Sequence, residues 1–338
     1  MKKINVGIIG LGYWGPNLYR NFDSNNNINI IAVADLDKKK LKKFSQKNAN
    51  LLTYLDYKKL ILNPNVNAVA ISTPVKTHYK IAKFALSHKK HVFVEKPLAD
   101  SSLKCLELIN ISKLNKLSLF VDHTFLYTEA VNKIKSISSK NDFGNIMYYD
   151  STRINLGLIQ NDINVIWDLA VHDLSILDFI QKNNPISISA IGHKHIKTKP
   201  ITSAYLTLIY KNNFIAHINV NWLSPVKIRQ TILGGSKKMI LYNDLEPSDK
   251  IKVFNKGVNV IIDEKTSNNL INYKLGDTYL PNLKNKEALS LAVDEFIKSI
   301  RNKRDPLTNG YRGYKIVKIL ECADESIRMN GKLVKINL

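Results

Sequence analysis

The chain has 338 residues, of which 44% are hydrophobic and 23% are charged, and its formal net charge is +22. Its length exceeds what one hydrophobic core usually organises, so we expect two domains, and its composition excludes a disordered or fibrous protein. No apolar stretch approaches the roughly 20 residues of a membrane helix, and Met1-Lys2-Lys3 leads into a strand pattern rather than a signal peptide, so we expect a cytoplasmic protein.

The positive charge is compatible with a nucleic-acid partner, but the lysines are spread along the whole chain. One cluster, Lys38-Lys39-Lys40 with Lys42-Lys43, lies on an expected solvated helix face. Because charge alone is a weak signal and the sequence has no recognisable reading helix, we expect no nucleic-acid partner. The positive field still favours a substrate that carries phosphates.

The two cysteines are expected to be reduced core residues. Cys105 and Cys322 lie in apolar helical patterns and lack the spacing of a redox pair or a metal site. We therefore expect neither a disulfide nor a bound metal.

The first 122 residues alternate short β-branched runs with helical patterns, which is typical of βαβ units around a doubly wound parallel sheet. Each run is nearly all apolar, as expected of strands that helices cover on both faces. A helix over Leu103–Leu114 follows two capping candidates, Asp100 and Ser101. The expected strands are Ile4–Ile9, Ile28–Ala34, Val66–Ile71, His91–Val94 and Leu117–Val121.

Residues 123–338 show a different pattern, in which strands follow one another after a single helical segment, Trp167–Ile180. This order predicts a mainly antiparallel sheet in a second domain of the α+β class, with a tight hairpin at Lys211-Asn212-Asn213. Two closing helices, near Lys286–Asn302 and Gly313–Met329, are able to pack back on the first domain. The expected strands are Ile186–Ile191, Ala204–Tyr210, Phe214–Trp222, Ile228–Leu233 and Met239–Tyr242.

The run Phe214–Trp222 has one apolar side and one mixed side. We expect the apolar side to pack on helices, which leaves the mixed side as either a surface for self-association or a solvated face. The apolar side consists of Phe214, Ala216, Ile218, Val220 and Trp222, and the mixed side of Ile215, His217, Asn219 and Asn221.

A glycine-rich loop, Gly10-Leu11-Gly12-Tyr13-Trp14-Gly15, follows the first strand and opens a helical run, which is the context expected of a dinucleotide-binding fingerprint. Gly10 permits the tight turn, Gly12 leaves room for a pyrophosphate, and Gly15 allows close packing of helix and strand. The helix amino terminus supplies N–H groups to the phosphates. We count Tyr13 and Trp14 with the glycines as cofactor-binding candidates.

Asp35 ends the second strand, 20 residues after Gly15. Its carboxylate is suited to accept hydrogen bonds from the adenosine ribose hydroxyls and to repel a 2′-phosphate, so we expect NAD as the cofactor. Lys38 to Lys40 are able to receive a phosphate, which keeps NADP as the alternative. A turn with a capping aspartate and no cofactor is the structural alternative.

Two further strand ends carry candidates for the cofactor site. Ser72-Thr73-Pro74 ends one strand, where Thr73 is able to bond the ribose or nicotinamide, and His78 is either a ligand or a helix-start residue without one. Glu95-Lys96-Pro97 ends another, so Lys96 faces the crevice where doubly wound sheets bind ligands. We include Glu95 among the cofactor-binding candidates.

Asp168 and His172 lie four residues apart on an expected helix and therefore share a face. The carboxylate is able to orient the imidazole or position a substrate hydroxyl, and histidine suits proton exchange with an alcohol. Lys96 brings a positive charge to a developing alkoxide. Without this context the two residues are equally well explained as an ordinary surface pair.

In order and spacing, the glycine loop, Ser72-Thr73-Pro74, Glu95-Lys96-Pro97 and the Asp168/His172 pair resemble the Gfo/Idh/MocA oxidoreductases over essentially the full chain. The resemblance implies a Rossmann domain, an open-faced sheet domain and a cis Lys96-Pro97 peptide. It also implies that Lys96, Asp168 and His172 are catalytic: His172 accepts the hydroxyl proton, Lys96 stabilises the oxyanion, and a sugar hydride passes to nicotinamide. Members are usually dimers or tetramers joined through the open sheet face, so a homodimer or homotetramer is expected.

Two segments, Ser151–Gly157 and Asn164–Ala170, are similar to a subgroup of sugar dehydrogenases associated with surface-polysaccharide synthesis. Arg153 is able to grip a phosphate or carboxylate, and Asn155 and Asn164 to read hydroxyls or an acetamido group, although each is equally well explained as a structural residue. The substrate candidates are therefore Arg153, Asn155 and Asn164 beside Lys96, Asp168 and His172.

The subgroup resemblance implies oxidation of the 3-hydroxyl of a UDP-linked N-acetylhexosamine, such as UDP-N-acetylglucosamine or its uronate, to a 3-keto sugar for an aminotransferase. Dehydrogenation of myo-inositol or a free sugar, and reduction of a 3-keto deoxysugar nucleotide, are alternatives. An alternative of another class is a nicotinamide-sensing protein without catalysis. The intact Lys96, Asp168 and His172 argue against a pure sensor.

Overall fold

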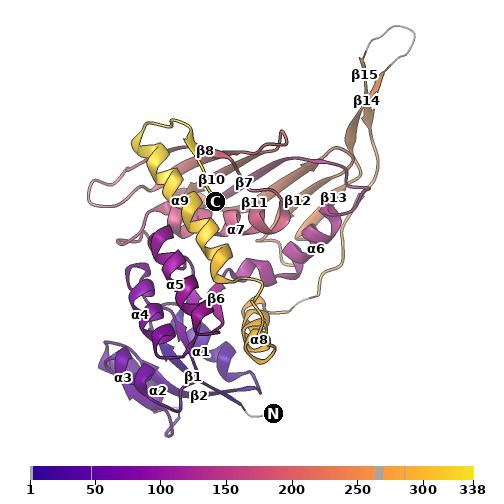
Figure 1. The fold of residues 1–338 in the computed structure, drawn as a ribbon. Coiled ribbons are helices and arrows are strands. Elements are labelled where there is room, and N and C mark those ends of the chain that lie inside the picture. Colours follow the sequence, from indigo (N-terminus) through magenta and orange to yellow (C-terminus); the bar gives the residue numbers. More distant parts are fainter. Residues whose placement is uncertain (1–2, 47, 263–268, 285) are drawn as a thin grey trace. The chain divides into compact units, whose positions relative to one another are not determined.

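The computed structural model describes residues 3–46, 48–262, 269–284 and 286–338, which form two compact units (Figure 1). The first unit comprises Met1–Tyr127 and Lys286–Lys318, and the second comprises Thr128–Asn285 and Ile319–Leu338. The first unit thus contains helix α8 (Ala288–Arg301) and the first turns of helix α9 (Gly310–Arg328) in addition to the first 122 residues.

The first unit is built on a six-stranded parallel sheet with the order β3-β2-β1-β4-β5-β6. This confirms the predicted doubly wound sheet, and the order reverses between β1 and β4, where such sheets bind ligands at the carboxyl ends of the strands. The strands are β1 (Ile4–Ile9), β2 (Ile28–Ala34), β3 (Leu52–Tyr54), β4 (Ala68–Ile71), β5 (His91–Glu95) and β6 (Leu119–Asp122). The helices are α1 (Gly15–Asp23), α2 (Lys38–Ser45), α3 (Tyr57–Leu62), α4 (Val75–Ser87), α5 (Ser102–Leu114) and the short 3₁₀ helix η1 (Thr124–Tyr127).

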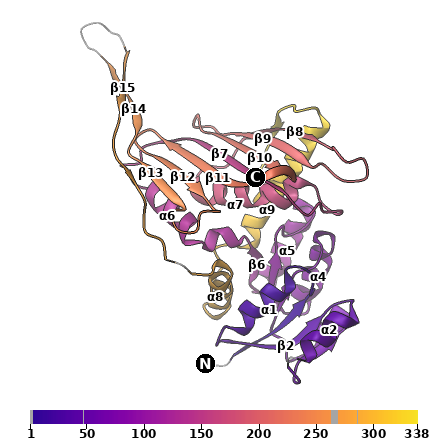
Figure 2. The same cartoon turned by 180° about the vertical axis from the view of Figure 1, so that it is seen from behind.

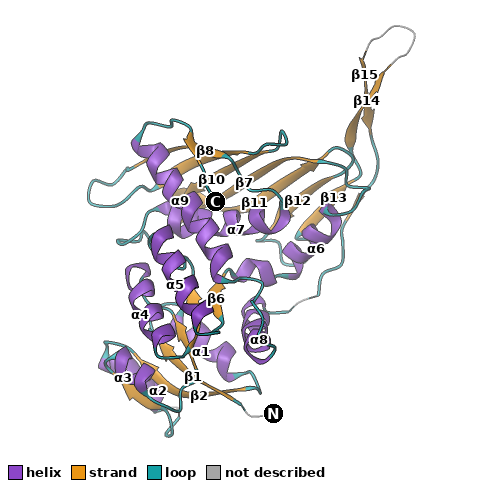
Figure 3. Ribbon diagram, viewed as in Figure 1, coloured by secondary structure: helices purple, strands orange, loops and turns teal. Residues whose placement is uncertain are grey.

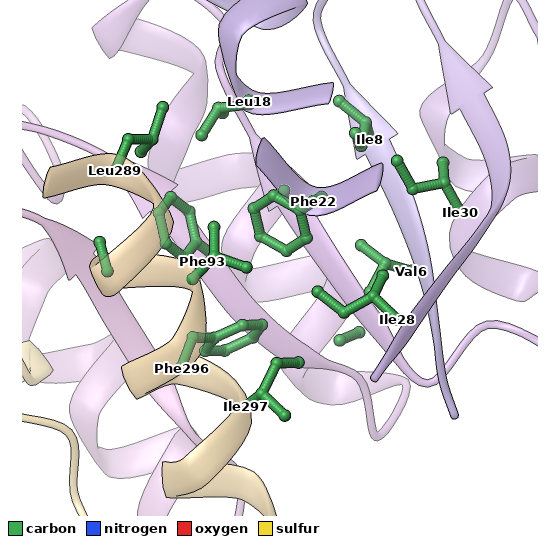
Figure 4. Close-up of a cluster of buried hydrophobic side chains, with 14 of the residues drawn as sticks. Val6, Ile8, Leu18, Phe22, Ile28, Ile30, Phe93, Leu289, Phe296 and Ile297 are labelled. Carbon is green, nitrogen blue, oxygen red and sulfur yellow. The ribbon is translucent and has the colours of Figure 1, made fainter. Parts of the chain in front are cut away.

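Helix α8 closes one face of this sheet although it comes late in the sequence. Figure 4 shows Phe296 and Ile297 of α8 beside Phe22 of α1 and Phe93 of β5, all within one buried cluster. The Phe93 ring meets Phe22 and Phe296 edge-on, with ring centroids 5.3 and 5.6 Å away. Each such aromatic pair contributes about 0.5–1.5 kcal/mol beyond its buried area, so this cluster fixes β5, whose end carries Lys96.

The second unit is built on a nine-stranded sheet with the order β16-β13-β12-β11-β7-β10-β9-β8-β17. Helices α6 (Glu129–Ser138) and α7 (Val171–Ile180) cover one face (Figure 3), and β14 (Gly257–Ile262) and β15 (Asn269–Lys274) pair in a separate two-stranded antiparallel sheet (Figure 2). Lys211-Asn212-Asn213 makes the predicted turn, with Asn213 at a φ of 54°. The strands are β7 (Ile146–Leu156), β8 (Ser187–His193), β9 (Ser203–Ile209), β10 (Ile215–Asn221), β11 (Leu223–Gly235), β12 (Met239–Asn243), β13 (Ile251–Phe254), β16 (Thr278–Tyr279) and β17 (Val334–Lys335).

The predicted mainly antiparallel sheet is confirmed, with one addition at its centre. Strand β7 was not expected from the sequence, yet it lies between β11 and β10 and pairs with β10 in parallel. Its pairing with β11 is antiparallel. The long connection from β7 through α7, β8 and β9 allows the chain to return in the same direction.

The two sides of β10 differ as the sequence predicts. Phe214, Ala216, Ile218, Val220 and Trp222 are at most 1% exposed, which confirms that this side packs on the helices. On the opposite face, large apolar side chains remain exposed: Ile191, Tyr205, Ile215 and Ile232. Self-association through this open face stays a prediction.

Cys105 and Cys322 are free and buried, which confirms the predicted reduced core residues. Among the described residues, no group of three or more His, Cys, Asp or Glu side chains is arranged to hold a metal ion. No helix in the described part of the chain combines the length and apolarity needed to cross a membrane.

Candidate active site

The glycine loop connects β1 to α1 and leaves open space where a pyrophosphate is expected. Gly10 has a φ of +92°, and a Cβ at Gly15 would lie 2.3 Å from the Gly10 carbonyl oxygen, so both positions require glycine to form the turn. A Cβ at Gly12, in contrast, would meet nothing within 4 Å. Gly12 is therefore not required by the loop itself, and its lack of a side chain leaves room for a ligand. The open space at Gly12 is therefore consistent with the pyrophosphate of a bound dinucleotide.

The amino terminus of α1 adds hydrogen-bond donors to this space. The helix begins at Gly15 without a side-chain cap from Trp14, so its first N–H groups are oriented toward the loop. Tyr13 is 90% exposed and Trp14 is 37% exposed, so both aromatic rings stand on the surface of the loop. Their contact with the cofactor stays a prediction.

Asp35 lies directly against the glycine loop. Its carboxylate accepts hydrogen bonds from the backbone N–H of Leu11 (2.6 Å) and of Asp37 (2.9 Å). Lys40 lies 4.0 Å from the same carboxylate. A fixed, negatively charged group at this strand end suits the ribose hydroxyls of NAD.

Ser72 and Thr73 join the end of β4 to the same loop. The Ser72 hydroxyl donates to the Gly10 carbonyl oxygen at 2.7 Å, which ties β4 to β1 across the point where the strand order reverses. Thr77, which sequence reasoning missed, has its hydroxyl 2.7 Å from that of Thr73 and donates to the Pro74 carbonyl oxygen at 2.6 Å. The turn after β4 is thus fixed by Ser72 on one side and by Thr77 on the other.

His78 is only 1% exposed and lies inside the first unit. Its Nδ1 atom is 2.8 Å from the Pro97 carbonyl oxygen, and its Nε2 atom is 2.7 Å from the Thr73 carbonyl oxygen. Both ring nitrogens therefore contact backbone, which supports a structural link and not the cofactor contact that the sequence offered as one option.

Lys96 follows β5 at the carboxyl edge of the sheet, and the Lys96-Pro97 peptide is cis, as the family resemblance implied. The preceding residue, Glu95, is the register partner of Asp122 on β6. The Asp122 carboxylate accepts a hydrogen bond from the Thr124 hydroxyl at 2.8 Å. The two acids therefore lie side by side next to Lys96.

Burial and mutual repulsion separate the protonation states of these two acids. Burial first, and then the charge of Asp122, raise the pKa of Glu95 well above its ordinary value. Burial also raises the pKa of Asp122, to about 6. Because ionising two adjacent buried acids is unfavourable, we expect the pair to retain one proton between them at neutral pH, beside Lys96.

His123 completes this interior group. Burial, followed by the charges of Arg312 and Lys96, lowers the pKa of His123 to about 3, so its imidazole is neutral at physiological pH. Asp122 and His123 were missed from the sequence. The available signal was an acid at the end of an apolar strand, opposite Glu95 in the expected sheet.

In the second unit, Asp168 lies in a π-helical turn, Ile166–Ala170, that continues into α7. The sequence predicted a regular α-helix from Trp167, and that prediction is wrong for the first turn. The Trp222 indole donates to the Asp168 carboxylate at 3.1 Å. Such π turns often occur at functional sites, because they reorient a side chain within a helix. His172 follows in the first turn of α7, and Lys96 belongs to the other unit.

Asn164 holds the π turn from its amino-terminal side. Its side-chain oxygen accepts from the N–H groups of Ile166 (3.0 Å) and Trp167 (3.2 Å), and its side-chain nitrogen donates to Asp324 (2.7 Å). Asp324 also accepts from the Trp167 indole at 2.6 Å. These bonds favour the structural reading of Asn164 that the sequence left open, and its substrate contact stays a prediction.

Arg153 is also bonded within the protein. The side chain is 3% exposed, and its Nε and Nη2 atoms donate to Asp173 at 2.7 and 3.1 Å. Ser151 donates to the same carboxylate at 2.7 Å. This buried ion pair favours the structural reading that the sequence left open, and a contact between Arg153 and a substrate phosphate stays a prediction. Asn155, near the end of β7, stays a prediction.

The sheet order, the glycine loop and Asp35 together are typical of a fold that binds a dinucleotide at the carboxyl ends of its strands. The chain belongs to the Gfo/Idh/MocA family. The model of this oxidoreductase family, described as an NAD-binding Rossmann fold, matches residues 4–123, and the model of the GFO/IDH/MocA C-terminal domain matches residues 133–241. The cofactor is NAD.

Two relatives align with nearly the whole chain. UDP-N-acetylglucosamine 3-dehydrogenase from Acidithiobacillus ferrooxidans is 22% identical over 94% of this chain and 95% of its own. Myo-inositol 2-dehydrogenase from Thermotoga maritima is 23% identical over 92% of both chains. The solved structure of the Acidithiobacillus enzyme, GnnA, shares the fold with a TM-score of 0.81, covering 97% of this chain and 99% of that one at 18% identity.

Proposed function

We propose that the protein uses NAD to oxidise the 3-hydroxyl of a UDP-linked N-acetylhexosamine, such as UDP-N-acetylglucosamine or its uronate. The observation that carries this proposal is the alignment with a UDP-N-acetylglucosamine 3-dehydrogenase over 94% of the chain. The net charge of +22 supports it, because a positive field attracts a substrate with a diphosphate more than an uncharged polyol. The 3-keto product would pass to an aminotransferase for surface-polysaccharide or lipid A sugar synthesis.

The proposed mechanism uses Lys96, Asp168 and His172. His172 accepts the proton of the sugar hydroxyl, while Asp168, held by the Trp222 indole at 3.1 Å, orients the imidazole or the hydroxyl. Lys96 stabilises the negative charge that develops on the oxygen as the carbonyl forms. NAD, held at the glycine loop and Asp35, would supply the hydride acceptor for this oxidation. The single negative charge of the Glu95/Asp122 pair partly offsets that of Lys96 from the interior.

The proposal is tested by following NADH absorbance with purified protein, NAD and a panel of UDP-N-acetylglucosamine, its uronate, myo-inositol and free sugars. A keto-trapping aminotransferase is included to draw the reaction forward. NADH formed only with a nucleotide sugar is the expected result, and NADH formed only with myo-inositol would overturn the proposal.

The role of Lys96 is tested by Lys96→Met. We expect this variant to bind NAD with nearly normal affinity and to lose turnover, since the developing oxyanion lacks its counter-charge. Lys113→Met is the matched control, because Lys113 is an exposed lysine in α5 of the same unit. Near-normal turnover by Lys96→Met would overturn the assignment.

The second candidate function is dehydrogenation of myo-inositol or a free sugar, which the alignment with the Thermotoga enzyme favours. Reduction of a 3-keto deoxysugar nucleotide is the same chemistry in reverse and is tested with NADH as the cosubstrate. A nicotinamide sensor would bind NAD and stay silent with every substrate. We also propose a homodimer or homotetramer joined through the open sheet face, to be checked by analytical ultracentrifugation.

A further inference from the structure

The His78 imidazole lies between two backbone carbonyl oxygens of the cofactor-binding unit. The distances are 2.8 Å from Nδ1 to the Pro97 oxygen and 2.7 Å from Nε2 to the Thr73 oxygen. A carbonyl oxygen only accepts hydrogen bonds, and a neutral imidazole donates from one nitrogen only. A neutral ring would therefore place its second lone pair against a carbonyl oxygen at hydrogen-bonding distance.

We infer that His78 is held as the doubly protonated imidazolium, and that it acts as a positioning residue that fixes the Thr73 turn to the segment after Lys96. Each nitrogen then donates one charge-assisted hydrogen bond, and both carbonyl oxygens are satisfied. The inference concerns the charge state and task of His78, and it rests on the binding of NAD by this unit.

The two carbonyl groups belong to separate parts of the candidate site. Thr73 is in the turn after β4, which Ser72 ties to the glycine loop at 2.7 Å. Pro97 directly follows Lys96 after β5. The His78 imidazolium therefore links the Thr73 turn to the backbone next to the proposed catalytic Lys96. A displacement of one segment would change the position of the other.

A buried charge needs partners, and the carbonyl dipoles supply them here. His78 is 1% exposed, so water contributes little. Two nearby acids already have cationic partners: Asp100, just before α5, is paired with Lys104 at 2.8 Å, and Glu107, on α5, is paired with Lys83 at 2.6 Å. The charged and titratable side chains on α4, on the elements around it in the first unit and on the segments that join them include Lys58, Lys59, Lys76, Lys80, Lys83, His88, His91, Glu95, Lys96, Asp100, Lys104, Glu107 and Lys113.

Two other histidines of this unit, the half-buried His91 and the buried His123, have different surroundings. The Nδ1 atom of His91 accepts the Ser118 N–H at 2.9 Å, and burial lowers the pKa of His91 to about 4. Burial, assisted by nearby positive charges, lowers the pKa of His123 to about 3. Both rings are neutral at physiological pH, so they provide internal references for the charge of His78.

The charge state is tested by NMR on the full protein labelled with ¹⁵N-histidine, which has only 8 histidines. The signal of His78 is assigned by its absence from the His78→Gln variant. At about pH 7.5 we expect both of its ring nitrogens to be protonated while those of His91 show a neutral tautomer. A neutral tautomer for His78 under these conditions would overturn the inference.

The positioning role is tested by titrating NAD and measuring kcat for His78→Phe and His78→Gln. His78→Phe removes both donors, and we expect weaker NAD binding and a loss of about tenfold or more in kcat. His78→Gln, which keeps one donating group, should recover part of this loss, and His91→Gln is the control for replacing a half-buried histidine of the same unit. Unchanged NAD affinity in His78→Phe would refute the coupling.

The NMR and NAD titrations need no sugar substrate. They therefore decide the inference even if the panel of nucleotide sugars shows no turnover. Failure of the proposed substrate and failure of the imidazolium inference are thus separate outcomes.

Discussion

Replacement of Arg153 by leucine distinguishes a structural arginine from a substrate ligand. Arg153 and Asp173 are 3% and 1% exposed, and their closest atoms are 2.7 Å apart. Arg153→Leu leaves Asp173 without its counter-charge in the interior, and breaking a buried pair in this way costs about 3–5 kcal/mol. We expect the free energy of unfolding of the second unit to fall by this amount, with little change in KM for the protein that stays folded.

The assay is urea unfolding followed by tryptophan fluorescence, since two of the three tryptophans, Trp167 and Trp222, belong to the second unit. The double variant with leucine at both Arg153 and Asp173 should recover much of the loss, because no unpaired charge remains. The control is Lys238→Met, whose partner carboxylate stays hydrated on the surface. A wild-type unfolding midpoint together with a raised KM in Arg153→Leu would refute the structural role.

Three further substitutions test the site. Gly12→Ala should keep the wild-type melting temperature, because the added Cβ meets nothing within 4 Å in the protein. The same Cβ enters the space expected for the pyrophosphate, so NAD binding should weaken roughly tenfold or more. Gly15→Ala should also lower the melting temperature, because its Cβ would lie 2.3 Å from the Gly10 carbonyl oxygen. Trp222→Phe should reduce kcat roughly ten- to hundredfold without changing NAD affinity, because Asp168 loses a hydrogen bond to its charged group; an unchanged kcat contradicts this. Asp122→Asn should stabilise the protein by on the order of 3 kcal/mol at about pH 7.5, since burial raises the pKa of Asp122 to about 6 and disfavours its ionised form in the folded state. The extra stability of Asp122→Asn over the wild type should shrink as the pH falls from about 6 toward 4. The same difference in urea midpoint between variant and wild type at about pH 7.5 and about pH 4 would contradict this prediction.

The sequence predicted the parts of the fold in which burial follows a simple period. β1, β2, β4 and β5 are covered by helices on both sides, so they are continuous apolar runs. β3 escaped prediction because it has only three residues, two of them exposed. β7 escaped because it buries polar side chains that pair with Asp173, and these interrupt the apolar alternation on which strand prediction depends.

In the candidate site too, residues at fixed spacings were predicted from the sequence, whereas residues whose roles depend on distant partners were not. Gly10, Gly12, Gly15 and Asp35 were found because a nucleotide loop places them at fixed spacings along one βαβ unit. The tasks of polar residues such as Asn164 were not predictable, because its partner Asp324 lies 160 residues further along the chain. From sequence alone, a polar side chain near a catalytic motif can be a sugar ligand or can hold the backbone in place. Only its partners far along the chain show which of these roles it has.

The π turn at Ile166–Ala170 shows why side chains that fix the backbone matter for the proposed chemistry. An α-helical spacing of four would place Asp168 and His172 on one face without further support. The turn at Ile166–Ala170 breaks this spacing, so the direction of the Asp168 carboxylate depends on side-chain contacts. Trp222 supplies one directly, and Asn164 and Asp324 fix the turn itself. In the proposed mechanism, the direction of the Asp168 carboxylate therefore depends on Trp222, Asn164 and Asp324 as well as on the helix itself.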